Sequence, residues 1–137
     1  MRATLALIAG LAAAPAALAQ AECGAGLDPK HRRVAEAPGL RLAFAPQPAP
    51  WATGRHFALE IEACPRAGEA LPAALSVDAD MPAHRHGMNY RPTVRATGPG
   101  RFRADGLMLH MPGRWRLTFE VPGPQGPLRL QHEIELP

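Results

Sequence analysis

Catalytic nucleophiles are nearly absent from this sequence. It contains a single serine, Ser76, which lies inside a predicted strand and has no nucleophile-elbow motif around it. Its two cysteines, Cys23 and Cys64, are expected to be oxidised and so to offer no reactive thiolate. We therefore expect no hydrolase and, more generally, a protein that is not an enzyme.

Long apolar runs are confined to the N-terminus. A positively charged start precedes an apolar stretch, 3–18, and small residues follow up to Ala21. This order is typical of a cleaved secretory signal. The stretch is too short for a membrane-spanning helix, which needs roughly 20 residues, and Pro15 interrupts it. We assign residues 1–21 to a signal peptide and expect a periplasmic or secreted mature chain without a membrane span.

The cysteine count fits export. An even number of cysteines in an exported chain is most simply a disulfide, here Cys23–Cys64. Closing a loop of that length would stabilise the fold by about 4 kcal/mol in the chain-entropy model. A pair of thiolate metal ligands is the alternative, but the two residues are far apart in the sequence.

Charge of one sign is not concentrated anywhere. The formal net charge is +3, which includes Arg2 of the expected signal, and Lys30 is the only lysine. The arginines are scattered among apolar residues and form no basic stripe of the kind that follows a phosphate backbone. We expect no nucleic-acid partner.

Alternation of apolar and polar residues dominates the chain from residue 40 onward. In 55–63, Phe57, Leu59 and Ile61 share one face, and 114–121 repeats the pattern. No segment has the period of an amphipathic helix. We predict one all-β domain, an immunoglobulin-like β-sandwich of about seven short strands, with a small barrel as the alternative. The expected strands are 40–44, 55–63, 75–79, 92–96, 101–104, 107–111, 114–121 and 128–136.

Glycine and proline set the expected boundaries. Pro46 is expected to end the first strand, and Asp105-Gly106 predicts a tight turn between two strands. Residues 22–39 hold several glycines and prolines among charges, so we expect an irregular segment held by Cys23. The sandwich domain is then 40–137.

Methionine and histidine are clustered in two patches, although most of the chain is aliphatic and could place methionine anywhere. The first patch, 81–92, follows a predicted strand, and its prolines and glycine predict a loop. The second patch, 108–111, lies on a later strand. Apart from Met1, the two patches contain every methionine and half of the histidines, namely Met81, His84, His86, Met88, Met108, His110 and Met111.

This combination of side chains favours copper. Thioether sulfur is soft and imidazole nitrogen borderline, so together they suit Cu(I), with Cu(II) possible through the nitrogens. A thioether has no proton to lose, so it remains a ligand at mildly acid pH, where imidazole begins to be protonated. We predict a copper site, chiefly Cu(I), formed by His84, His86 and Met88, with Met81, Met108 and His110 as further ligands.

Each of these residues also has a structural interpretation. Met111 is in register with Leu107 and Leu109, so core packing is favoured for it. Met81 is either a ligand or a plug at the end of the core, and the other residues are either ligands or surface groups. The remaining histidines, His31, His56 and His132, are expected to be solvated.

A different metal site is a weaker alternative. Asp78 and Asp80 precede His84 and His86, and two imidazoles with a carboxylate can bind iron or zinc.

Three spaced motifs resemble the YtkA-like domain, which is related to the periplasmic part of FixH proteins. They are Met81-Pro82 to His86-Gly87-Met88, then Gly98-Pro99-Gly100-Arg101-Phe102, then Met111-Pro112-Gly113-Arg114-Trp115. The resemblance covers about residues 40–137 and implies a small sandwich outside the cytoplasmic membrane. FixH members are linked to the assembly of copper-containing oxidases, so the resemblance implies a copper-protein or membrane-oxidase partner.

Two functions follow as expectations. The first is a periplasmic copper-binding protein that acts as a carrier, chaperone or sequestering agent. The alternative is a metal-free interaction module that assists assembly of a membrane or exported complex. This second function needs no metal, because the Met/His loop would then contact a protein.

Overall fold

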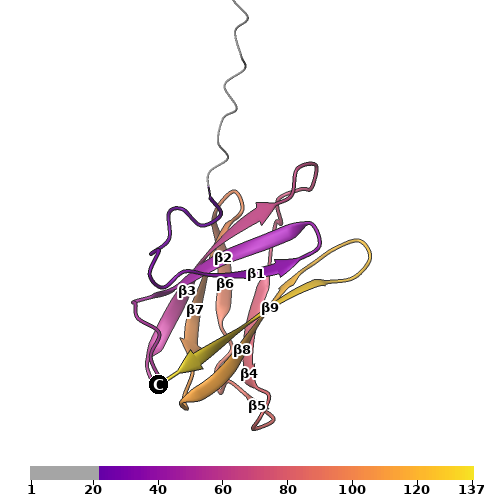
Figure 1. Cartoon of the computed structure of the whole chain (residues 1–137). Helices are drawn as coiled ribbons and strands as arrows, with labels where there is room; N and C mark the ends of the chain where they lie inside the picture. Colours follow the sequence, from indigo (N-terminus) through magenta and orange to yellow (C-terminus); the bar gives the residue numbers. More distant parts are fainter. Residues whose placement is uncertain (1–21) are drawn as a thin grey trace, which may run out of the picture.

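Two antiparallel sheets, packed face to face, make up the described part of the chain. A computed structural model describes residues 22–137, and the expected signal peptide, 1–21, lies outside these residues (Figure 1). No helix occurs within 22–137. The strands are β1 (Arg33–Ala37), β2 (Leu40–Gln47), β3 (His56–Pro65), β4 (Ser76–Met81), β5 (His86–Gly87), β6 (Thr93–Gly98), β7 (Arg101–Met108), β8 (Gly113–Val121) and β9 (Leu128–Leu136).

The strand order confirms the predicted β-sandwich and not the barrel. One sheet has the order β1-β2-β3-β7-β6 and the other the order β5-β4-β8-β9. All neighbouring strands pair antiparallel. The structure has nine strands: β1 and β5 match none of the eight expected ranges, and the expected strands 101–104 and 107–111 correspond to the single strand β7.

The core forms between the two sheets because the alternating strands turn their apolar side chains inward. In β3, Phe57, Leu59 and Ile61 are buried as predicted. In β8 every second residue from Trp115 to Val121 is buried. Burial of apolar surface at about 25 cal/mol per Å² is the main stabilising term of such a core.

The N-terminal segment differs from expectation. Residues 22–39 are not irregular throughout, because β1 lies within them and pairs with β2. Pro38 and Gly39 connect the two strands, and Gly39 has a φ of 82°, the value that the third position of a Pro-Gly turn requires. The glycine and proline that suggested irregularity thus form a hairpin turn.

The disulfide is confirmed. Cys23 and Cys64 are joined, with their Cα atoms 5.8 Å apart. Cys64 is near the end of β3, where it pairs with Arg41 of β2. The bond therefore ties the start of the described chain to the end of a central strand.

Two expected boundaries are wrong. β2 continues through Pro46, which lies beyond the part of β2 that pairs with β1. At Pro46 the strand therefore has a neighbour on one side only, β3, and proline, which has no backbone N–H to donate, is tolerated there. Asp105-Gly106 is not a turn. These residues of β7 stand opposite the single Ala58 of β3, which makes a β-bulge, and Gly106 supplies the positive φ of 88°.

Within residues 22–137, no helix is present that is long and apolar enough to cross a membrane.

Candidate metal centre

A tight hairpin turn positions two of the predicted ligands. β4 and β5 pair through Met81 and His86, so the chain reverses over residues 82–85. His84 N–H donates to the Met81 carbonyl oxygen at 3.1 Å, which closes the turn. Arg85 has a φ of 54°, a left-handed conformation that is uncommon for a residue with a side chain. His84 and His86 therefore flank Arg85, the residue with this strained backbone conformation.

The third imidazole comes from the connection between the two sheets. His110 follows the end of β7, where Gly54 N–H donates to the Leu109 carbonyl oxygen at 2.8 Å and extends the ladder beyond the strand. The bulge at Asp105-Gly106 lies just before this point, and bulges bend a strand and redirect the side chains that follow. The chain then crosses to β8 at the same end of the sandwich as β5 (Figure 1).

The structure therefore brings the two patches together. The ring centroids of His84 and His86 are 5.8 Å apart, and those of His86 and His110 are 5.2 Å apart. Two imidazoles that share one ion at a metal–nitrogen distance of about 2.0 Å have centroids about 5 to 6 Å apart. We call His84, His86 and His110 the imidazole cluster.

Trp115 lies beneath the imidazole cluster. Its indole is fully buried and meets His86 and His110 edge to face, at centroid distances of 5.8 and 5.3 Å. Its Nε1–H donates to the Met111 carbonyl oxygen at 3.0 Å, which fixes the ring. The alternation of 114–121 places Trp115 in the core but does not reveal this contact, because a strand pattern shows which face a residue occupies and not which loop lies over its end.

The nitrogens of the cluster differ in their partners. His86 Nδ1 lies 3.2 Å from the Gly87 carbonyl oxygen. Because a carbonyl only accepts, this contact is a hydrogen bond in the tautomer with the proton on Nδ1, which leaves the Nε2 lone pair for a metal, the arrangement that metal-binding histidines use. His110 Nδ1 is buried without a hydrogen-bond partner in the described chain. An unpartnered buried nitrogen costs about 1–3 kcal/mol.

The donor atoms are near one another but do not converge in this conformation. Among residues 22–137, no three imidazole, thiolate or carboxylate groups are already placed to hold one metal ion. Side-chain rotations at the exposed His84 and the half-buried His86 are therefore needed before the cluster can bind an ion. Thioethers could complete the ligand set.

The methionines occupy four different environments. Met81 is 1% exposed and plugs the end of the core, on the same face as its cross-strand neighbour His86. Met111 packs against the core, as its register with Leu107 and Leu109 indicated. Met88 also packs against the core and lines a groove along β4. Met108 is half-buried, opposite His56 in the β3–β7 pair.

His56 and Tyr90 were not singled out as site residues from the sequence. His56 is exposed, as expected, but its ring lies 4.9 Å from that of Tyr90 in a T-shaped arrangement. Tyr90 is 43% exposed. The two residues are far apart in the sequence, and only the fold brings them together; His56 is also the strand partner of Met108.

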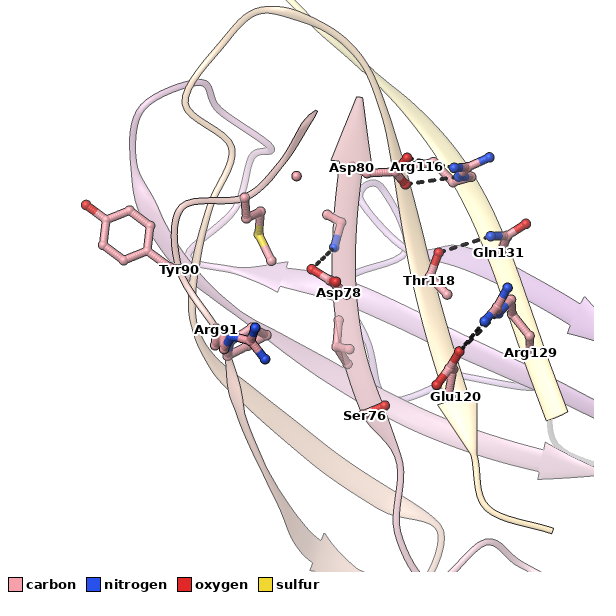
Figure 2. A pocket seen from close by; sticks show the side chains of 15 residues that line it. Ser76, Asp78, Asp80, Tyr90, Arg91, Arg116, Thr118, Glu120, Arg129 and Gln131 are labelled. Atoms are coloured by element: carbon pink, nitrogen blue, oxygen red, sulfur yellow. Dashed lines mark hydrogen bonds and ion pairs between the residues drawn. The ribbon is translucent and has the colours of Figure 1, made fainter. Parts of the chain in front are cut away.

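The carboxylates of β4 belong to a groove on the outer face of the smaller sheet. Asp80 accepts two hydrogen bonds from Arg116, at 3.0 and 2.6 Å, and these bonds raise the pKa of Arg116. Asp78 accepts from the Ala79 N–H at 2.8 Å. Figure 2 shows both carboxylates engaged in these contacts, with Tyr90 and Arg91 along one side of the groove. An iron or zinc site that used either carboxylate with the imidazoles is therefore not supported.

The comparisons with known proteins add no family. No protein-family model, no curated protein and no solved structure matches the chain.

Proposed function

We propose that this chain is an exported copper-binding protein that carries or sequesters Cu(I) as its cargo. The observation that carries the proposal is the imidazole cluster, in which two segments more than 20 residues apart in the sequence bring three rings to one end of the sandwich. The Cys23–Cys64 disulfide is compatible with export. The resemblance to the YtkA-like domain points in the same direction and suggests a copper protein or membrane oxidase as recipient.

The donor types support copper over harder ions. Imidazole nitrogen with thioether sulfur suits Cu(I), whereas magnesium and calcium require oxygen ligands. Asp78 and Asp80, the carboxylates nearest in sequence, are held by other groups. His86 offers Nε2, and the thioether closest to it in the strand register is that of Met81. The cargo keeps its oxidation state, because carriage requires ligand exchange only.

The test is a Cu(I) competition titration against a chromogenic chelator. We expect one-to-one binding by the purified protein and its loss in the His84→Ala/His86→Ala/His110→Ala variant. The control is His31→Ala, since the His31 ring makes none of the ring contacts of the cluster and only its backbone carbonyl oxygen accepts from Trp51. Equal binding by the triple variant and the control would show that the cluster is not the site.

A second function has an observation of its own in the groove along β4. The groove encloses about 620 Å³. The β4 edge beside it pairs with the short β5 at Asp80 and Met81 and accepts from the Met88 N–H at Ala79, so in the described chain only the first part of this edge, Ser76 to Asp78, has no neighbouring strand. An exposed strand edge can bind an extended peptide. On this alternative, the protein is a metal-free interaction module that assists assembly of a membrane or exported complex.

The two functions give opposite results in one pull-down. An interaction module would capture the same partner with and without a copper chelator, because backbone pairing needs no metal. Capture that disappears when copper is chelated would contradict the interaction module and support the copper carrier.

A further inference from the structure

We propose that His56 and Met108 form a second, outer site for a soft monovalent cation, covered by Tyr90 and adjacent to the imidazole cluster. This inference rests on the proposed function, because it assigns the cluster a neighbouring site for the same cargo. Neither His56 nor Tyr90 had a role in the predicted ligand set.

The register of the larger sheet places the two donors together. His56 and Met108 are direct partners in the β3–β7 pair, so their side chains leave the sheet on the same face with Cβ atoms about 4.5–5.5 Å apart. The neighbouring partners, Phe57 and Leu107, are both buried. The alternation therefore puts His56 and Met108 on the outer face, where His56 is exposed and Met108 half-buried.

The chemistry of the pair suits Cu(I) better than hard cations. One thioether and one imidazole form a soft, low-coordinate set without a carboxylate. Tyr90 adds an aromatic ring whose centroid is 4.9 Å from that of His56. An aromatic ring within about 6 Å of a cation attracts it electrostatically. The site has two side-chain donors, so we expect weaker binding than at the imidazole cluster.

The two sites are connected through the backbone on both sides. Met108 is two residues before His110, a span of about 7 Å in an extended chain. Tyr90 follows His86 by four residues on the other side. β3 and β7 are interior strands of their sheet, so the outer pair has a rigid support. The outer pair is thus joined to the cluster by two short stretches of backbone, and passage of a cation between them requires ligand exchange only, without a change of oxidation state.

The experiment is an Ag(I) titration of the purified protein, observed through the methyl signals of ¹³C-labelled methionine. Ag(I) is a soft monovalent cation without accessible redox chemistry. We expect two equivalents to bind, with the Met108 methyl signal moving during the second equivalent. Met108→Leu and His56→Gln should each bind one equivalent only. Met111→Leu is the matched control, because Met111 packs against the core, and should still bind two.

The outcomes separate this inference from the proposed function. In one outcome, a single equivalent binds without moving the Met108 signal, and this equivalent is lost in the His84→Ala/His86→Ala/His110→Ala variant. That outcome would overturn the outer site and leave the copper carrier intact. In another outcome, the Met108 signal still moves in the triple variant, and this variant binds as many equivalents as the unaltered protein. That outcome would support the outer site and contradict the cluster. No binding at all would refute both.

Discussion

Truncation of Met81 tests the end of the core directly beneath the imidazole cluster. The side chain is 1% exposed, and its Cε is 3.2 Å from the position that a Cβ on Gly113 would occupy. Met81→Ala removes the side chain beyond Cβ from a closely packed region. Such substitutions cost about 2–5 kcal/mol, and we expect about 3 kcal/mol here. Met81→Leu keeps the volume and should cost less than about 1.5 kcal/mol.

Urea denaturation followed by tryptophan fluorescence measures both variants, since Trp115 is fully buried at the same end of the core. With a slope of about 1.5 kcal/mol per M urea, a loss of about 3 kcal/mol lowers the midpoint by about 2 M. A decrease in the free energy of unfolding below about 1 kcal/mol for Met81→Ala would refute the packing argument. Cu(I) titration of Met81→Leu then shows whether the thioether is also a ligand, because this variant keeps the packing and loses the sulfur.

Two further predictions concern the N-terminal part of the described chain. Replacing Cys23 and Cys64 together by alanine should lower the free energy of unfolding by about 4 kcal/mol, since the bond closes a loop with a sequence separation of 41. The measurement is urea denaturation. A change in the free energy of unfolding below about 1 kcal/mol, with an unaltered slope, would contradict this prediction. Gly24→Ala should destabilise by about 2 kcal/mol or more, because Gly24 has a φ of 74° and its new Cβ would lie 2.4 Å from that of Ala43. Gly26→Ala is the control, with nothing within 4 Å of its added Cβ, and an equal thermal shift in both variants would refute the steric reasoning.

The sandwich was predictable because its strands alternate strictly. β8 and β9 were expected at 114–121 and 128–136 and occur at Gly113–Val121 and Leu128–Leu136. One face of each is buried in the core, so a register shift would expose the apolar set. The bulge at Asp105-Gly106 was not predictable, because the same dipeptide serves a turn or a bulge and only the pairing with β3 decides between them.

The candidate site was predictable in its residues but not in its grouping. The clustering of methionine and histidine along the chain is enough to indicate His84, His86 and His110 as candidates. Their meeting at one end of the sandwich depends on the order of strands in two sheets, which no local pattern encodes. The fold places Met88 along the groove and buries Met81, and a ligand role for either thioether stays a prediction.

The hydrogen bonding at the outer edge of β4 affects the tendency of the protein to aggregate at high concentration. The Met88 N–H donates to the Ala79 carbonyl oxygen, so the N–H of Ala79 faces the same open side, where the Asp78 carboxylate accepts from it. A second chain that tried to extend this sheet would meet a negative charge in place of a free donor. Open strand edges are templates for aggregation, and charged side chains along them oppose it. The carboxylate that lines the groove therefore also protects the smaller sheet from joining its own copies.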